Sequence, residues 1–367
     1  MRRSLTIGLG GAGICTLAIF AYQAQPWQFG PFSRPVTAPV IAPNPASLFR
    51  DPISGETVHW EALHTFNPAA IVRNKKIYVL YRAEDDTGEM QIGLHTSRLG
   101  LAESADGIHF SRRPQPVLYP DRDAQRDREW PGGCEDPRIV ESEDGAYVLT
   151  YTQWNRRRTD AAIATSKDLV HWSKHGPALG TEGKYAALSY KSAGIVARLK
   201  GNRLVAAKIA GKYWMYWGEG AVRLATSADL IHWTPVEDAA GETVVTLAKR
   251  KGHFDSSFPE TGPPPLLTEH GIVVLYNGKN AAADGDPSLG PNAYATGQAL
   301  FAKDDPARLL ARTDEPVLKP ELPFERTGQY AAGTTFAEGL VWFQHKWFVY
   351  YGCADSFVSV ATAGSSQ

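Results

Sequence analysis

The chain is poor in cysteine and methionine, with three of each among its 367 residues. So few cysteines exclude a disulfide-rich scaffold. No C-x-x-C, H-E-x-x-H or EF-hand spacing occurs, so we expect neither a metal site nor a cofactor. Neither sign of charge is in excess, because 38 Lys and Arg face 39 Asp and Glu, for a net charge of −1. This balance argues against nucleic acid or an anionic membrane surface as the main partner, since both select basic faces.

Helical patterns are also missing, because no long segment beyond the N-terminus carries apolar residues at a 3.6-residue period. Glycine (34 residues), proline (25) and aromatic residues (10 Trp, 15 Tyr and 14 Phe) are instead plentiful. This composition is typical of a turn-rich β protein.

The N-terminal residues differ in character from the rest. Arg2 and Arg3 precede an apolar, glycine-rich run from about Leu5 to Tyr22, which is typical of an export signal. A run of this length also suits an uncleaved anchor, so we predict a signal peptide or membrane anchor at 1–24. The proline-rich stretch 25–45 is predicted to be an extended tether, and 46–367 the folded domain. Both alternatives predict an exported protein, periplasmic or extracellular, either free or held at the membrane by the N-terminal segment.

Three similar segments indicate an internal repeat. Ser104–Phe110, Ser166–Trp172 and Ser227–Trp233 each contain Ser-x-Asp, then His and an aromatic residue, and they start 62 (104 to 166) and 61 (166 to 227) residues apart. A period of this size is typical of repeated β units such as propeller blades. Five runs rich in β-branched and aromatic residues have strand character: 77–82, 147–152, 204–209, 272–277 and 347–351. We therefore predict an all-β fold, a single five-bladed β-propeller, with two packed β-domains as the alternative.

Polar residues open each of the five units. In a propeller the first strand of every blade lines a central channel, so residues far apart in the sequence meet there. Converging polar groups in a concave site are the default hypothesis for a binding site, so we expect the active site in the central funnel. The residues that the propeller would gather are Asn67, Asp136, Arg138, Lys191, Glu260 and Glu338.

Five short motifs in this order carry a family resemblance. They are Phe66-Asn-Pro68, Tyr81-Arg-Ala-Glu-Asp85, Gly132-Gly-Cys-Glu-Asp-Pro-Arg138, Gly262-Pro-Pro-Pro265 and Tyr351-Gly-Cys-Ala-Asp355. From about Asn67 to the C-terminus the chain closely resembles glycoside hydrolase family 130. The resemblance implies a five-bladed propeller that acts on β-mannosides, either as a phosphorylase or as a hydrolase.

The resemblance also implies catalytic roles. Asp136 corresponds to the general acid, which acts through the 3-hydroxyl of the mannosyl unit as a proton relay. Glycoside cleavage needs a second group on the other face of the sugar. Glu219 and Glu260 stand where phosphorolytic members carry the cations that hold phosphate. Two carboxylates repel phosphate and suit the activation of water, and which of the two is the base is left open.

We therefore predict an exported, inverting hydrolase of β-mannosides, similar to the β-1,2-mannosidases of the family. The alternatives are a phosphorylase that releases mannose 1-phosphate and a non-catalytic glycan-binding propeller. The expected partner is an oligosaccharide or glycan substrate, and the sequence leaves its linkage, its length and the oligomeric state of the protein open.

The other predicted site residues bind the sugar. By resemblance Asn67, Arg82 and Asp355 hold mannosyl hydroxyls, with Asp85 and Lys191 as further candidates. Arg138, two residues after Asp136, completes the predicted substrate-binding set. Two groups outside the site are predicted to be structural: the cysteines of different units, Cys134 and Cys353, as free buried thiols, and the repeated histidines His109, His171 and His232.

Overall fold

The computed structural model describes residues 25–364, in which nearly all regular structure is β-strand. These residues contain one short α-helix, α1 (Arg126–Glu129), and one turn of 3-10 helix at Pro323–Glu325. The predicted all-β class is confirmed.

The strands follow one another in five groups, preceded by a hairpin of β1 (Phe49–Arg50) and β2 (Thr57–Val58). The first two groups are β3 (His64–Arg73), β4 (Lys76–Glu84), β5 (Ser97–Ser104) and β6 (Ser111–Arg112), then β7 (Gly133–Glu141), β8 (Tyr147–Trp154), β9 (Thr159–Ser166) and β10 (Trp172–Pro177). The third group has shorter strands: β11 (Ala193–Ile195), β12 (Ala197–Lys200), β13 (Arg203–Ala206), β14 (Lys208–Ile209), β15 (Lys212–Trp217), β16 (Val222–Ser227), β17 (Trp233–Pro235) and β18 (Val245–Leu247). The last two groups are β19 (Phe258–Thr261), β20 (Leu266–Leu267), β21 (Ile272–Lys279), β22 (Tyr294–Phe301) and β23 (Leu309–Arg312), then β24 (Phe336–Phe343), β25 (Lys346–Cys353) and β26 (Phe357–Gly364).

Five strand groups agree with the five predicted units, but the five-bladed propeller itself is not confirmed. The hydrogen-bonded strands form sheets of two, fifteen, six and three strands, and none of them closes. Parallel links join neighbouring groups, as where β5 meets β7 and β12 meets β20. The propeller therefore stays a prediction.

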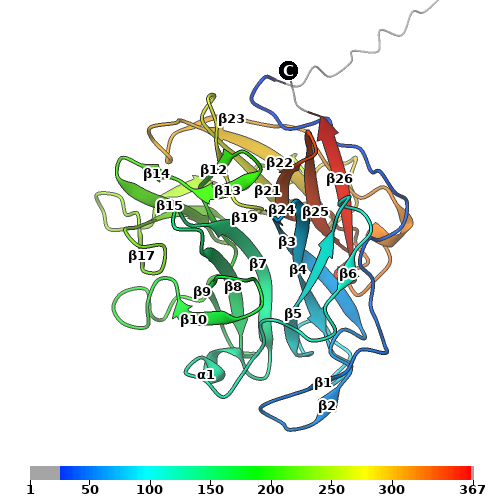
Figure 1. The fold of residues 1–367 in the computed structure, drawn as a ribbon. Coiled ribbons are helices and arrows are strands. Elements are labelled where there is room, and N and C mark those ends of the chain that lie inside the picture. The colour runs from blue at the N-terminus through cyan, green and yellow to red at the C-terminus, as the bar shows by residue number, and fades with distance from the viewer. Residues whose placement is uncertain (1–24, 365–367) are drawn as a thin grey trace, which may run out of the picture.

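The first strands of the groups lie in the middle of the molecule, with β10, β17, β23 and β26 toward its periphery (Figure 1). β3 packs against both β7 and β24. All nine residues of β7 are buried, so this strand carries core contacts and site residues at once. Because one end of each central strand reaches the same region, side chains from distant parts of the chain can meet there.

The three repeated segments form the turns that follow β5, β9 and β16. In each, an Asp Oδ1 accepts backbone N–H groups two and three residues later, and Oδ2 contacts the Nδ1 of an exposed His at 2.7–2.8 Å. For Asp106 and Asp168, hydrogen bonds to that His hold the pKa well below its usual range. The repeat is therefore a turn motif, and the prediction that these histidines are structural is confirmed.

The segment 25–45, predicted to be a tether, packs against the domain, so that prediction is wrong. Ser33 and Ile41 form β-bridges with Thr362 and Val358 of β26, and Ile41 is 1% exposed. Arg34 donates to both carboxylate oxygens of Glu325. Proline restricts a chain to extended conformations, and an extended chain can lie along a strand as well as cross solvent.

The predicted signal peptide or anchor at 1–24 lies outside the described residues. Within residues 25–364 no helix has the length and apolar character needed to cross a membrane.

Candidate active site

A cavity of about 330 Å³ lies where the strand groups meet. Every group contributes to its lining, either from its first strand or from an adjacent segment. Its lining includes Asn67, Arg82, Gly93, Glu135, Asp136, Trp154, Lys191, Glu219, Glu260, Tyr294, Gln329, Tyr330 and Asp355.

Two of these side chains reach the cavity because their strands are interrupted by bulges. The register of β3 shifts at Asn67, and the register of β7 shifts at Asp136. Both residues have left-handed backbone, with φ of 46° and 48°. Asn and Asp tolerate this conformation better than other non-glycine residues, and a bulge re-aims the side chain. Gly352 leaves the space that Asn67 needs, because a Cβ there would lie 2.3 Å from the Asn67 Oδ1.

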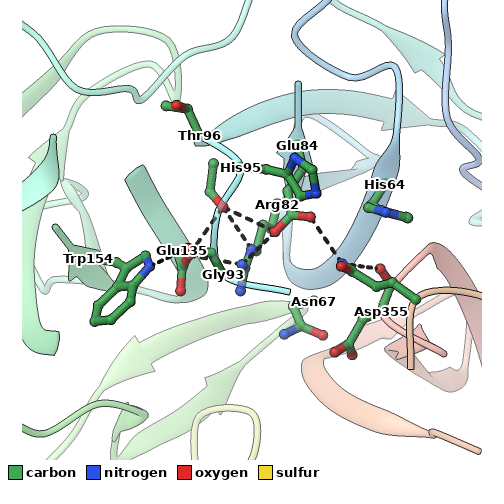
Figure 2. Close-up of polar contacts among 12 residues, drawn as sticks. His64, Asn67, Arg82, Glu84, Gly93, His95, Thr96, Glu135, Trp154 and Asp355 are labelled. Carbon is green, nitrogen blue, oxygen red and sulfur yellow. Dashed lines mark hydrogen bonds and ion pairs between the residues drawn. The ribbon is translucent and has the colours of Figure 1, made fainter. Parts of the chain in front are cut away.

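Asp136 belongs to a network of charged groups built around Arg82. The Asn67 amide donates to Asp136 Oδ1 at 2.8 Å, and Arg82 Nη1 donates to the same oxygen at 3.2 Å. The Arg82 guanidinium also pairs with Glu84 at 2.6 Å and with Glu135 at 2.9 Å (Figure 2). One guanidinium thus holds three carboxylates in place.

The network separates the pKa values of two adjacent carboxyl groups. Burial opposes ionisation of Asp136, but the positive charges of Arg82, Lys191 and Arg138 outweigh it and lower its pKa to about 2. Burial raises the pKa of Glu135 to about 7, and the negative charge of Asp136 adds to that rise. Between these values the pair holds one proton, which resides on Glu135 in the ligand-free site.

A second cluster in the cavity contains Lys191 and two carboxylates. The Lys191 Nζ lies 3.6 Å from Glu219 Oε1 and 3.8 Å from Glu260 Oε1. Glu260 is 1% exposed and accepts a short hydrogen bond from the Ser192 hydroxyl, whereas the Glu219 side chain is 40% exposed. Burial raises the pKa of Glu260 to about 7 against the opposing charge of Lys191.

Seven of the nine predicted site residues line the cavity: Asn67, Arg82, Asp136, Lys191, Glu219, Glu260 and Asp355. Asp85 and Arg138 do not, and their assignment to substrate binding is corrected. Asp85 is buried and accepts Arg98 Nη1 at 2.6 Å. Arg138 lies beneath the cavity, pairs with Glu338 at 2.9 Å and donates to the carbonyls of Thr261 and Gly262. Both side chains are occupied by the protein itself.

Replacing Arg98 by Met is expected to lower the free energy of unfolding by about 3–5 kcal/mol, because it leaves two buried carboxylates unpaired. Arg98 lies 2.6 Å from both Asp51 Oδ2 and Asp85 Oδ2, and all three side chains are 1% exposed. Urea unfolding measures the change. The control is Arg308→Met, whose side chain is 58% exposed and should change stability by less than about 0.5 kcal/mol. Equal effects of the two substitutions would contradict the structural role of Arg98.

Sequence reasoning missed several cavity residues. Glu135 stands beside Asp136 in the sequence, but its raised pKa depends on burial, which the sequence does not reveal. Tyr294, Gln329 and Tyr330 reach the cavity from a strand start and a loop outside the repeat. Tyr294 packs edge to face against Tyr330, with ring centroids 5.5 Å apart, and against Phe336. These rings give the polar cavity an aromatic wall suited to the apolar face of a sugar.

A larger hollow of about 650 Å³ adjoins this cavity and shares Thr159, Lys191 and Glu219 with it. It extends the site outward along residues 184–190, so a ligand longer than the inner cavity can continue into it.

Cys134 and Cys353 are buried and unpaired, as predicted.

Comparison with known proteins agrees with the geometry. The family model described as beta-1,4-mannooligosaccharide phosphorylase matches residues 43–366. A 1,2-beta-oligomannan phosphorylase from Thermoanaerobacter sp. (strain X514) is 33% identical over 306 residues, covering 82% of this chain and 90% of that protein.

Solved structures are more similar still. One carries the description "The GH130 family of mannoside phosphorylases contains glycoside hydrolases that target beta-1,2 mannosidic linkages in Candida mannan"; it is 50% identical, covers 94% of this chain and 97% of its own, and has a TM-score of 0.92. A glycosyl hydrolase from Bacteroides ovatus is 49% identical, with coverages of 94% and 97% and a TM-score of 0.91. This chain belongs to glycoside hydrolase family 130.

Proposed function

We propose that this member of the family hydrolyses β-mannosides, with β-1,2-linked mannosides as the first substrates to test. The observation that carries the proposal is the pair Glu219 and Glu260 on either side of Lys191. A phosphate dianion needs several cationic donors, and here Lys191, the cation beside Glu219 and Glu260, is already paired with these two carboxylates. The same carboxylates can accept a proton from water. The solved chains that are about half identical, described in terms of glycoside hydrolases, add support.

The proposed reaction inverts the anomeric centre. Water attacks the anomeric carbon of the terminal mannosyl unit, and Glu260 accepts a proton from that water as the new carbon–oxygen bond forms. The glycosidic carbon–oxygen bond breaks, and its oxygen receives a proton that comes from the Asp136 side through the sugar 3-hydroxyl. We assign Glu260 as the base because it is buried and fixed by Ser192, and Glu219 as a second carboxylate that holds the water.

The proton positions in the free site predict a bell-shaped pH profile for kcat/KM. Glu260 must be ionised, so activity should fall as the pH drops below its pKa of about 7. The Asp136 and Glu135 pair must keep its one proton, so activity should also fall as the pH rises above the pKa of Glu135, about 7. Glu135→Gln removes the group that holds this proton and should move the alkaline limb to lower pH. An unchanged alkaline limb in this variant would contradict the role of Glu135.

A phosphorylase is the second candidate, and the names of the curated relatives favour it. The matching family model and the relatives at 33% and 29% identity are all described as phosphorylases of mannosides. In that reaction inorganic phosphate replaces water as the nucleophile, and the product is mannose 1-phosphate.

The experiment is to incubate the protein with β-1,2-mannobiose, with and without inorganic phosphate, and to quantify mannose and mannose 1-phosphate. We expect mannose at the same rate in both conditions, with the α-anomer appearing first by NMR. Mannose 1-phosphate that forms only with phosphate would overturn the hydrolase proposal and establish the second candidate. No product in either condition would overturn both for this linkage, and β-1,4-mannobiose would then be tested in the same way.

A further inference from the structure

Two histidines and a glutamate gather beside the cavity, outside the groups assigned to the reaction. One ligand-capable atom from each of His64, Glu84 and His95 lies within 4.8 Å of the other two. The residues come from the start of β3, the end of β4 and the segment before β5. Figure 2 shows both rings and the Glu84 carboxylate close together beside Arg82. Their sequence spacing matches no metal motif, because the strands bring them together.

Hydrogen bonds fix the orientation of both rings. The His95 Nδ1 lies 3.1 Å from the Thr87 carbonyl oxygen, which can only accept, so Nδ1 carries the proton and Nε2 has a free lone pair. The His64 Nδ1 lies 2.9 Å from the Ser356 hydroxyl, which can accept the Nδ1 proton in the tautomer that leaves Nε2 free, or donate to Nδ1 in the other. Within residues 25–364 neither Nε2 has a hydrogen-bond partner. A ring held through Nδ1 with a free Nε2 is the arrangement of metal-binding histidines in proteins.

We propose that His64, Glu84 and His95 bind a divalent transition metal ion of the zinc type. Two imidazoles and one carboxylate suit Zn²⁺, whereas Mg²⁺ and Ca²⁺ prefer oxygen ligands alone. Bonds of about 2.0–2.2 Å place tetrahedral ligand atoms roughly 3.4 Å apart. The ligand atoms, which lie within 4.8 Å of one another, therefore need to approach by up to about 1.4 Å when the ion binds. The fourth position is left for water or another small ligand.

The charges that face the cluster favour a cation. Arg82 is the nearby positive group, and it is already paired with Glu84, Glu135 and Asp136. Asp355 adds a further carboxylate, and Gln329 Nε2 links its backbone carbonyl to Glu84 Oε2 at 2.9 and 3.0 Å. Because Glu135 holds the proton of its pair with Asp136, the carboxylates around this guanidinium are Glu84, Asp136 and Asp355, and a bound divalent ion reduces their excess of negative charge.

The ion would join two parts of the site. Glu84 holds Arg82, which in turn holds Asp136, while His95 ends the segment that brings Gly93 into the cavity. The Gly93 carbonyl accepts the Trp154 indole N–H at 2.9 Å. Metal binding would therefore brace the 85–96 segment against the strands that carry the Arg82 network.

The test is isothermal titration of the chelator-treated, untagged full-length protein with ZnCl₂. We expect the wild-type protein to bind one ion per chain. Loss of a group that only supports a metal ligand typically lowers affinity by about 10–100-fold, so loss of a ligand itself in His64→Asn or His95→Asn should lower the affinity for zinc by more than that. His270→Asn is the matched control, since His270 is exposed on the turn before β21 and should leave binding unchanged. No binding to the wild type, or equal binding by all three variants, would overturn the proposal.

A second measurement does not depend on how the variants fold. X-ray absorption at the zinc edge of the loaded wild-type protein should show two imidazole nitrogens at about 2.0–2.1 Å together with oxygen. Coordination by oxygen alone, or by a single imidazole, would overturn the site.

Discussion

Asp136→Asn is expected to lower kcat on β-1,2-mannobiose by about 10²–10⁴-fold with little change in KM, because the amide cannot supply the proton that the leaving oxygen needs. Asn has the shape of Asp, so it can keep the contacts with Asn67 and Arg82 that position the side chain. Steady-state kinetics of mannose release measures both constants. Asp304→Asn is the matched control, because this exposed aspartate lies on the turn after β22 and should leave both constants unchanged.

A merely structural role for Asp136 would give a different result. A mannoside whose leaving group needs no proton, such as a dinitrophenyl β-mannoside, should be cleaved by the variant at nearly the wild-type rate. An equal loss on both substrates, together with a lower melting temperature, would show that Asp136 supports the fold. In either candidate reaction the leaving oxygen needs a proton, so this result tests the acid without choosing between water and phosphate.

Much of the site could be predicted because its chemistry is local in sequence. Asn67-Pro68 and Asp136-Pro137 place residues that tolerate left-handed backbone at the openings of their units, where the structure has bulges. The sequence also places Lys191 and Glu260 in the cavity, because each stands at the opening of a predicted unit.

Other features depend on partners far away in the sequence. Asp85 belongs to the same sequence motif as Arg82, yet its carboxylate accepts hydrogen bonds from Arg98 and Thr87 instead of facing the cavity. The extended 25–45 segment has the composition of a linker. It packs against the domain because Ser33 and Ile41 form β-bridges with the edge of β26, a strand more than 300 residues further along the sequence. The number of strand groups follows from the five strand-like runs, whereas closure into a propeller, which stays a prediction, would depend on contacts between groups that no local pattern encodes.

In the proposed reaction the two clusters of the cavity would divide the chemistry between them. Arg82 keeps Asp136 ionised in the free site and leaves the proton on Glu135. Lys191 lies 3.6 Å from Glu219 and 3.8 Å from Glu260, so under the proposal one wall would supply a proton and the other would accept one. Acid and base functions on two carboxylates are set apart by environment in this way in other glycosidases.

Glu260→Gln separates the two candidate reactions by the sign of its effect. If water is the nucleophile, loss of the base should lower kcat by about 10²–10⁴-fold. Glu219→Gln, at the more exposed carboxylate, should have the smaller effect. If phosphate is the nucleophile, no base is needed, and removing a negative charge beside Lys191 should improve phosphate use.

Azide tests the same residue directly, since it is a nucleophile that needs no base. Under the hydrolase proposal, added azide should restore cleavage by Glu260→Gln and form an α-mannosyl azide, with no such gain for Asp136→Asn on β-1,2-mannobiose. Activity of Glu260→Gln that is unchanged without phosphate would remove Glu260 from the reaction. Because Asp136→Asn should slow both candidate reactions and Glu260→Gln should slow only hydrolysis, the two substitutions together distinguish a wrong acid from a wrong nucleophile.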